Sequence, residues 1–238
     1  MRAPKLDYLP RGPKHPKFHK LGLIGCGGIA QYHLTAAKSF GVEVVALADV
    51  NIDAAKNRRD EFYPKAEVFS DYHQLLTRKD ITVVEIATHT EIRGDHIKNS
   101  LKAGKHVLSQ KPFTFDLQEG RRLAAYAKRK NLRLGVNQNG RWAPQFAALI
   151  AAVRAGLLGD IHTLDLSLAW DHTWTRGSKF ADLHHLILSD FGIHWFDAVT
   201  CVFGDRKARS VFANAVKAPQ QDMKVPMLAN AIINFGDG

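Results

Sequence analysis

The chain has 238 residues, of which 45% are hydrophobic and 24% charged, ordinary values for a globular protein of one large or two smaller domains. No apolar run approaches the roughly 20 residues that a membrane span needs, and the basic N-terminus lacks the apolar core of a secretory signal. We therefore expect no membrane partner. The two cysteines, Cys26 and Cys201, are too few for a disulfide framework, so we expect a cytoplasmic protein.

The formal net charge of +10 is concentrated at the N-terminus. Residues 1–20 hold six Lys or Arg and one Asp, which is about half of the excess. No basic stripe interleaved with aromatic residues follows, so we expect no nucleic-acid partner. We expect residues 1–17 to form a Pro-rich basic arm, either a solvated extension or a tether that packs against a partner subunit.

Apolar runs alternate with helical patterns between residues 18 and 140. The strand-like runs are 21–27, 42–50, 66–69, 81–88, 105–110 and 132–138. The helical runs are 29–40, 51–63, 71–79, 91–104 and 116–130. Asp71 is suited to cap the third helix and Gly104 to end the fourth. This alternation predicts an α/β fold with a doubly wound parallel sheet, which binds ligands at the carboxyl ends of its strands.

The pattern changes after about residue 140. A helix, a strand, a second helix and two more strands are indicated in this order: 143–159, 161–170, around 189–197, 208–216 and 227–235. Strands without helices between them favour an antiparallel sheet, so we expect residues 141–238 to form a second domain of α+β type. So few strands would leave a sheet edge exposed, which suggests a truncated chain or a partner that covers the edge.

The stretch GCGGIA has the glycine pattern of a dinucleotide-binding turn. Gly25 permits the tight turn, Gly27 lets the backbone approach a pyrophosphate, and Ala30 lets helix and strand pack closely. The turn follows a strand and opens a helix, which favours a cofactor site over a purely structural turn. The predicted cofactor-binding residues here are Gly25, Gly27, Gly28, Ile29, Ala30 and Asp49.

Asp49 ends the next strand, 24 positions after Gly25. Its carboxylate would accept hydrogen bonds from ribose hydroxyls and would repel a 2′-phosphate, so we expect NAD, with NADP the less favoured cofactor. Arg58 and Arg59 further along the chain leave NADP open. Cys26 has no base beside it in sequence, so we expect a small buried residue rather than a nucleophile.

The run AGKHVLSQKPF ends a strand with Gln110-Lys111-Pro112 at the ligand edge of the sheet. There the lysine could donate a hydrogen bond to a substrate hydroxyl, whereas most lysines are solvated surface charges. Four stretches, LGLIGCGGIAQYH, AGKHVLSQKP, VNQNGRWAPQF and SDFGIHWFD, occur in the order and spacing of the Gfo/Idh/MocA family (glucose–fructose oxidoreductase, inositol dehydrogenase and rhizopine catabolism). Residues 18–238 resemble that family.

The resemblance implies an NAD(P)-binding Rossmann domain at 18–140 and a mostly antiparallel C-terminal domain at 141–238. It also implies an enzyme, an NAD(P)-dependent dehydrogenase that transfers hydride between nicotinamide and a sugar, polyol or cyclitol hydroxyl carbon. Family members are usually longer. They normally carry Glu-Lys-Pro with the lysine in the active site, which Lys111 matches, and we expect a cis bond before Pro112.

Gln110 departs from the family's glutamate. The amide keeps hydrogen bonding but loses the charge. Activity could be retained, altered in substrate preference or lost, so the alternative to a dehydrogenase is a catalytically inactive NAD(P)-binding sensor or regulator of the same fold. We expect both Gln110 and Lys111 to lie in the cofactor site.

The stretch SDFGIHWFD places Asp190, His194 and Asp197 on one face of a helix if the whole run is α-helical. Such a face could be a solvated stripe or a catalytic surface. In the resemblance, Asp190 and His194 match an Asp-x-x-x-His pair that acts with the lysine. We therefore expect His194 as general acid/base, Lys111 as the donor that polarises the reacting oxygen, and Asp190 as an orienting and substrate-binding group. Asp197 could join them or pair with a cation.

Arg141, Trp170 and His172 are further candidates for binding substrate, beside Asp190 and His194. Aromatic faces pack against sugar C–H groups, although a core or dimer-interface cluster with Trp142 and Trp174 would have the same composition. Four residues of this region could ligate zinc: His184, His185, Asp190 and His194. Their spacing fits no standard zinc pattern, so we expect no metal, and we expect His184 and His185 to frame the pocket or cap the helix. We also expect a homo-oligomer through the C-terminal sheet.

Overall fold

The computed structural model describes residues 5–12, 14–16, 18–183 and 185–236. The chain divides into two compact units. One unit is Arg11–Asn137, and the other combines Gln138–Gly238 with Met1–Pro10. Among the described residues, no helix has the length and apolar character needed to cross a bilayer.

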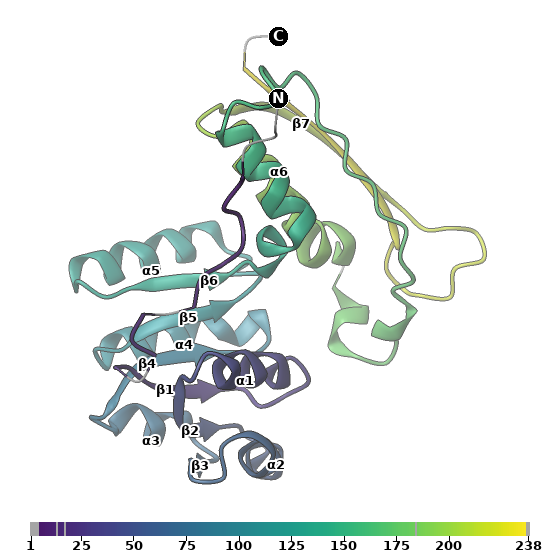
Figure 1. Ribbon diagram of the computed structural model, residues 1–238. Helices are drawn as coiled ribbons and strands as arrows, with labels where there is room; N and C mark the ends of the chain where they lie inside the picture. The colour runs from purple at the N-terminus through teal and green to yellow at the C-terminus, as the bar shows by residue number, and fades with distance from the viewer. Residues whose placement is uncertain (1–4, 13, 17, 184, 237–238) are drawn as a thin grey trace. The chain divides into compact units, whose positions relative to one another are not determined.

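A six-stranded parallel sheet forms the centre of Arg11–Asn137 (Figure 1). The strands are β1 (Lys20–Ile24), β2 (Glu43–Ala48), β3 (Glu67–Phe69), β4 (Ile81–Ile86), β5 (His106–Gln110) and β6 (Leu134–Asn137). Their spatial order is β3-β2-β1-β4-β5-β6. The chain runs outward from β1 to β3 and then returns to place β4 on the other side of β1. This reversal is the point at which doubly wound sheets bind ligands.

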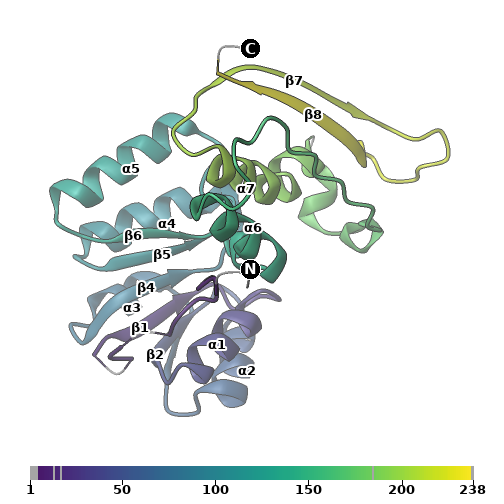
Figure 2. The ribbon, with the colours of Figure 1, turned by 45° about the horizontal axis from the view of Figure 1, so that its top comes forward.

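Helices cover both faces of this sheet (Figure 2). They are α1 (Ala30–Ser39), α2 (Ile52–Phe62), α3 (Tyr72–Thr77), α4 (Thr90–Lys102) and α5 (Leu117–Arg129). One core cluster joins the strands to α1 and α2 through residues such as Leu34 and Ala55. The other joins them to α3, α4 and α5 through residues such as Leu75, Ile97 and Leu123. Burial on both faces explains why these strands have apolar runs rather than alternating patterns.

Side-chain caps start three of the helices. Asn51 accepts hydrogen bonds from the backbone N–H groups of Asp53 and Ala54 at the start of α2. Asp71 and Asp116 cap α3 and α5 in the same way. Gly104 follows α4 with a φ of 75°. The predicted roles of Asp71 and Gly104 are therefore confirmed, as is the doubly wound parallel sheet.

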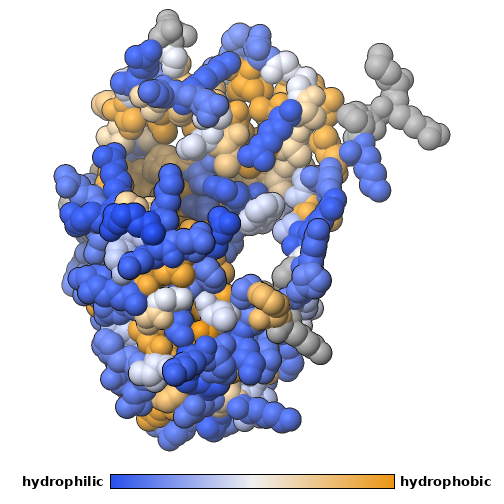
Figure 3. All heavy atoms as spheres, turned by 90° about the vertical axis from the view of Figure 1, so that its left-hand side faces the viewer, coloured by the Kyte–Doolittle hydropathy of each residue, from blue (hydrophilic) through white to orange (hydrophobic). Residues whose placement is uncertain are grey.

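The unit Gln138–Gly238 has two longer helices, α6 (Pro144–Arg154) and α7 (Ile193–Phe203), and an antiparallel hairpin of β7 (Ala208–Val216) and β8 (Leu228–Phe235). Short 3₁₀ turns lie at Asn139–Trp142, Thr173–Thr175 and Lys179–Asp182, and a π-helical turn at Ile187–Phe191. The expected antiparallel sheet is thus present as two strands. Apolar side chains of the hairpin reach the surface. The exposed members include Val211, Phe212, Val216, Leu228 and Ile232. Figure 3 shows apolar side chains interspersed with polar ones on one face of the molecule.

The expected strand at 161–170 is wrong, because these residues have no regular secondary structure. An alternating pattern makes a strand only where a neighbouring strand pairs with it, and among the described residues the run 161–170 pairs with neither β7 nor β8. The backbone oxygen of Ile161 instead accepts a hydrogen bond from the Arg206 side chain, and Trp170 is 63% exposed.

The expected uninterrupted helix over SDFGIHWFD is also wrong. The backbone N–H of Gly192 donates to the oxygen of Ile187 at 2.6 Å, a bond that spans five residues, and α7 begins only after it. A π-helical turn inserts about one extra residue into a helical turn. Asp190 therefore precedes the helix that carries His194 and Asp197, and the i, i+4, i+7 spacing does not define a common α-helical face.

Candidate functional site

The glycine loop leads from β1 into α1. Gly25 has a φ of 95°, and a Cβ there would lie 2.9 Å from the carbonyl carbon and oxygen of Ala87. Glycine adopts such a conformation without strain. A Cβ at Gly27 or Gly28 would meet no atom within 4 Å, so the loop backbone faces open space at these two positions. This space is what a pyrophosphate needs if it is to approach the backbone.

The start of α1 suits an anion. This helix has no side-chain cap, whereas α2, α3 and α5 each have one. The uncapped N–H groups and the helix dipole together favour a phosphate group. Ala30 is fully buried, which allows the close helix–strand packing that the motif predicts, and Ile29 before it is 40% exposed.

Asp49 follows β2 and joins two loops. Its Oδ2 accepts from the backbone N–H of Cys26 at 2.7 Å, and its Oδ1 accepts from that of Asn51 at 2.8 Å. The carboxylate therefore lies beside the glycine loop, where the ribose hydroxyls of a dinucleotide are expected. The thiol of Cys26 is buried, and burial together with the Asp49 charge raises its pKa to about 12. This thiol fits the predicted packing role rather than that of a nucleophile.

Arg58 reaches the same loop from α2. Its Nη2 donates to the backbone oxygen of Gly27 at 3.3 Å, and its Nη1 pairs with Glu61 at 3.0 Å. A cation thus lies close to the loop that Asp49 also contacts. Arg59 instead pairs with its neighbour Asp60 and is directed elsewhere.

Gln110, Lys111 and Pro112 lie at the end of β5, on the carboxyl edge that also carries the glycine loop of β1. The Lys111–Pro112 bond is cis, as predicted. Gln110 is 7% exposed, and its Oε1 accepts from the backbone N–H of Lys111 at 2.8 Å. The parallel sheet thus brings the two predicted cofactor segments of this unit to one edge.

Three buried residues support this turn and were not among the predicted site residues. His33 of α1 lies between Gln110 and Glu85 of β4, and Arg93 of α4 donates to the backbone oxygens of Gln110 and Pro112. One signal was present in the sequence, because Glu85 interrupts the apolar strand ITVVEI at a buried position. A buried carboxylate requires a partner, but the sequence does not reveal which residue provides it.

The unit Gln138–Gly238 holds the Asp190 and His194 pair. Asp190 is 6% exposed in the π-helical turn, and His194 lies in the first turn of α7. A Cβ at Gly140 would overlap the His194 ring, so the glycine allows the 3₁₀ turn to pack directly on the imidazole. Gln138 also donates to the backbone oxygen of Ile193 at 3.1 Å.

Asp197 forms an ion pair with Arg141. The Arg141 Nε and Nη2 donate to the two carboxylate oxygens at 2.9 and 2.5 Å. Of the two roles considered for Asp197, the pairing with a cation is therefore observed. The same pair occupies two donors of Arg141, a residue predicted to bind substrate, and ties the 3₁₀ turn at Asn139–Trp142 to α7.

Trp170 and His172 belong to an aromatic cluster within the same unit. The His172 ring lies 3.7 Å from that of Phe191 and 4.8 Å from that of Trp170, measured between centroids. His172 Nδ1 lies 3.1 Å from the Trp170 backbone oxygen, so Nδ1 carries a proton and donates to that oxygen. Within the described part of the chain, the buried Nε2 of the same ring has no hydrogen-bond partner. Trp174, at 58% exposed, gives the cluster an open face.

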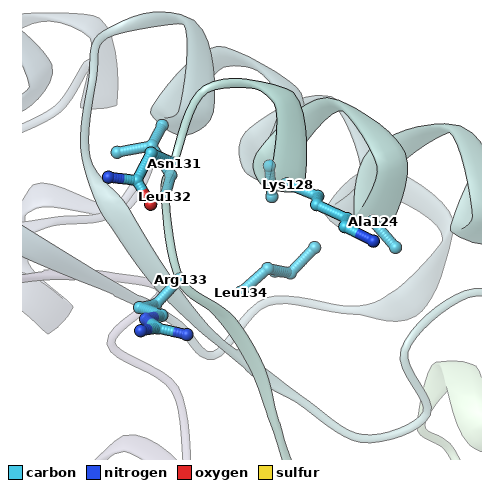
Figure 4. Close-up of a pocket in the computed structure, with 7 residues that line it drawn as sticks. Ala124, Lys128, Asn131, Leu132, Arg133 and Leu134 are labelled. Atoms are coloured by element: carbon cyan, nitrogen blue, oxygen red, sulfur yellow. The ribbon is translucent and has the colours of Figure 1, made fainter.

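Over the described residues, no group of three His, Cys, Asp or Glu side chains is arranged to hold a metal ion. His185 is exposed, and His184 lies outside the described residues. A cavity of about 290 Å³ lies between the end of α5 and the start of β6 (Figure 4). It is at the amino end of that strand, on the edge opposite the glycine loop. Its lining consists of Ala124, Ala127, Lys128, Asn131, Leu132, Arg133 and Leu134.

Comparison with protein families agrees with this geometry. Residues 19–138 match the model described as an oxidoreductase family with an NAD-binding Rossmann fold, and residues 146–238 match the GFO/IDH/MocA C-terminal domain. The chain belongs to the Gfo/Idh/MocA family. The resemblance of the four motifs is thereby confirmed, and the dinucleotide fold of this Gfo/Idh/MocA protein is of the NAD-binding type.

Similar proteins include sugar and cyclitol dehydrogenases. D-apiose dehydrogenase of Paraburkholderia graminis is 29% identical over 79% of this chain and 51% of that protein. The NADP(+)-dependent scyllo-inositol 2-dehydrogenase IolW of Bacillus subtilis is 28% identical over 88% of this chain and 59% of that protein. A crystal structure of a putative myo-inositol dehydrogenase from Sinorhizobium meliloti 1021 has a TM-score of 0.74 at 25% identity, over 91% of this chain and 65% of that one. The chain thus spans about half to two thirds of the length of these relatives.

Proposed function

We propose that this protein transfers hydride between NAD(H) and a hydroxyl-bearing carbon of a sugar, polyol or cyclitol. The observation that carries the proposal is that one edge of the parallel sheet presents both the glycine loop after β1 and Lys111 after β5. Its relatives include a D-apiose dehydrogenase and a scyllo-inositol 2-dehydrogenase, so sugars and cyclitols are the substrate classes to test.

The residues of the loop fit the cofactor. Gly27 and Gly28 leave the space that a pyrophosphate would fill, and Asp49 lies where it can accept from ribose hydroxyls. When bound, NAD supplies the hydride acceptor. The ammonium group of Lys111 donates to the reacting oxygen and lowers the energy of the charge that develops there.

The proton requires a base, because oxidation of an alcohol releases the hydroxyl proton as well as a hydride. We assign that role to His194, since imidazole changes its protonation near neutral pH. Asp190, buried ahead of α7, would orient the substrate or the imidazole. Trp170, His172 and Arg141 are kept as proposed substrate contacts.

We also propose that NAD is preferred over NADP. The Asp49 carboxylate opposes a 2′-phosphate. Arg58 would favour one, because its guanidinium donates to the Gly27 oxygen on the same loop. The backbone N–H groups of Cys26 in the glycine loop and of Asn51 before α2 hold the Asp49 carboxylate beside the loop, so we expect it to dominate. Dissociation constants for NAD and NADP, measured on the wild type and on Asp49→Ser, test this preference, which should weaken or reverse in the variant.

The activity is tested by a panel of sugars, polyols and cyclitols with NAD, following NADH absorbance. Lys111→Ala should abolish turnover and leave NAD binding intact. Lys98→Ala is the matched control, because Lys98 is exposed on α4 and pairs with Asp95 at 3.9 Å. No thermal shift or binding signal with NAD or NADP would refute a dinucleotide function altogether.

Gln110 favours a second candidate, a sensor that binds the cofactor without turnover, because the acid that normally precedes the lysine is missing here. The same panel separates the two proposals. NAD binding without NADH formation on any substrate supports the sensor, whereas turnover that depends on Lys111 supports the dehydrogenase.

A further inference from the structure

Gln110 connects Lys111 to a buried histidine. The Gln110 Oε1 accepts from the backbone N–H of Lys111 at 2.8 Å. This contact fixes the amide orientation, because the oxygen must face Lys111, and the NH₂ group then faces His33. The Gln110 Nε2 lies 3.4 Å from His33 Nε2, a long hydrogen bond between two buried groups.

The donor and acceptor roles then determine the protonation of His33. An amide NH₂ group can only donate, so His33 Nε2 must offer its lone pair. The ring proton is therefore on Nδ1, which contacts Oε1 of Glu85. His33 and Glu85 are 7% and 6% exposed, so water does not replace these partners. The Glu85 carboxylate accepts from His33 Nδ1–H, and His33 Nε2 accepts from the Gln110 amide. The Gln110 oxygen in turn accepts from the Lys111 backbone N–H. We call this chain of hydrogen bonds the hydrogen-bond relay.

A buried arginine holds the other side of the same turn. Arg93, 3% exposed, donates through Nη1 to the backbone oxygen of Gln110 at 3.0 Å and to that of Pro112. Its Nε donates to the backbone oxygen of Thr88 at 3.1 Å, which anchors the guanidinium to the end of β4. The backbone of Lys111 is thus held through its own N–H and through the carbonyl groups on both sides.

We propose that Gln110 is a positioning residue of the lysine turn and that the Glu85–His33 pair requires an amide there. A carboxylate at position 110 could not donate to His33 Nε2, and it would place two acids on one buried imidazole. In this chain, the buried acid is instead supplied by β4. The Gln110 amide is then the partner that the buried Glu85–His33 pair requires, and it does not by itself indicate that catalytic activity is lost. The effect on turnover rests on the proposed function, but the hydrogen-bond relay does not.

The relay itself is tested by nitrogen NMR on the full chain labelled with ¹⁵N-histidine. The His33 signals are assigned by their loss in His33→Gln. In the wild type we expect a protonated Nδ1 and an unprotonated Nε2. In Gln110→Glu we expect Nε2 to gain a proton. In the exchange variant Glu85→Gln/Gln110→Glu, the carboxylate lies on the other side of the ring, so the tautomer should invert to Nε2–H. A protonated Nε2 in the wild type, or the same tautomer in all three proteins, would overturn the proposal.

Kinetics then test the positioning role. Gln110→Met keeps the length of the side chain but removes both hydrogen-bonding atoms, and we expect kcat to fall roughly 10- to 100-fold, as small misplacements of catalytic groups do. The dissociation constant for NAD should change less than kcat does, because the Gln110 side chain contacts the Lys111 backbone and His33. The exchange variant should recover most of the loss in kcat that Gln110→Glu alone shows. Gln118→Met, at an exposed position in the first turn of α5, is the control and should behave as wild type.

The outcomes separate this proposal from the proposed function. If no substrate is turned over even by the wild type, the dehydrogenase proposal fails, and the NMR result alone decides the relay. If the wild type turns over substrate and Gln110→Met keeps its kcat, Gln110 does not position Lys111. The exchange variant could also unfold like the wild type and show the inverted tautomer without recovering kcat. That result would likewise show that Gln110 does not position Lys111.

Discussion

Replacing Gly25 with alanine should destabilise the unit Arg11–Asn137. At a φ of 95°, an L-residue is strained by about 1–2 kcal/mol. The new Cβ would also lie 2.9 Å from two backbone atoms of Ala87, and overpacking of this kind typically costs about 1–3 kcal/mol. The sum, after partial relaxation, is about 3 kcal/mol. With a urea m-value of roughly 2 kcal/mol per molar, the unfolding midpoint should fall by about 1.5 M.

Urea unfolding followed by far-UV circular dichroism measures this shift, and Gly27→Ala is the matched control. A Cβ at Gly27 meets no atom within 4 Å, and this glycine is not among those with positive φ. Its midpoint should therefore stay within about 0.3 M of wild type. Its affinity for NAD should nevertheless fall at least about tenfold, because the methyl group fills the space that the pyrophosphate needs. Equal stability losses in the two variants, or none in Gly25→Ala, would refute the reasoning.

Three further predictions concern stability. Asp197→Asn weakens the two-point contact with Arg141 and should cost about 1 kcal/mol in thermal unfolding at low salt, with a smaller difference at high salt; an equal loss at both would contradict an ionic cause. Asp71→Ala removes the cap of α3 and should cost about 1 kcal/mol in urea unfolding, whereas Asp71→Asn, which keeps an acceptor, should not. Burial raises the pKa of the Cys26 thiol from 9.0 to about 12, so the unfolded chain loses this proton first and stability falls as pH rises above about 9. Cys26→Ala should make that fall shallower between pH 9 and 11 in urea midpoints, and an unchanged slope would disprove it.

Local patterns were sufficient to predict most of the unit Arg11–Asn137. Each strand is an apolar run followed by a helical run, and caps such as Asp71 act within two or three residues of their own position. The glycine loop has the same local character, since Gly25 is required by its own backbone angle. The strands β7 and β8 were also predicted, because each lies in a short apolar run that contains β-branched and aromatic residues, such as Val211, Phe212 and Ile232.

The rest depends on partners that are distant in sequence. His33 and Gln110 are 77 residues apart, and His33 and Glu85 are 52 apart, so no local pattern pairs them. The run at 161–170 has the alternation of a strand but no ladder to join. The π-helical turn before α7 includes a bond from the Gly192 N–H to the Ile187 oxygen that spans five residues, and helical periodicity alone does not reveal it.

The double contact of Asp49 has a consequence for motion. The same carboxylate holds the amide proton of Cys26 in the glycine loop and that of Asn51 at the start of α2. A carboxylate has about four acceptor positions, so it can keep both amide protons while it accepts from two adjacent hydroxyls of a ligand. Occupancy of the ribose position would therefore leave the glycine loop tied to the end of β2 and shield this contact from water. The exchange of the Cys26 amide with deuterium then becomes a local reporter, which distinguishes a bound ribose from a bound phosphate alone.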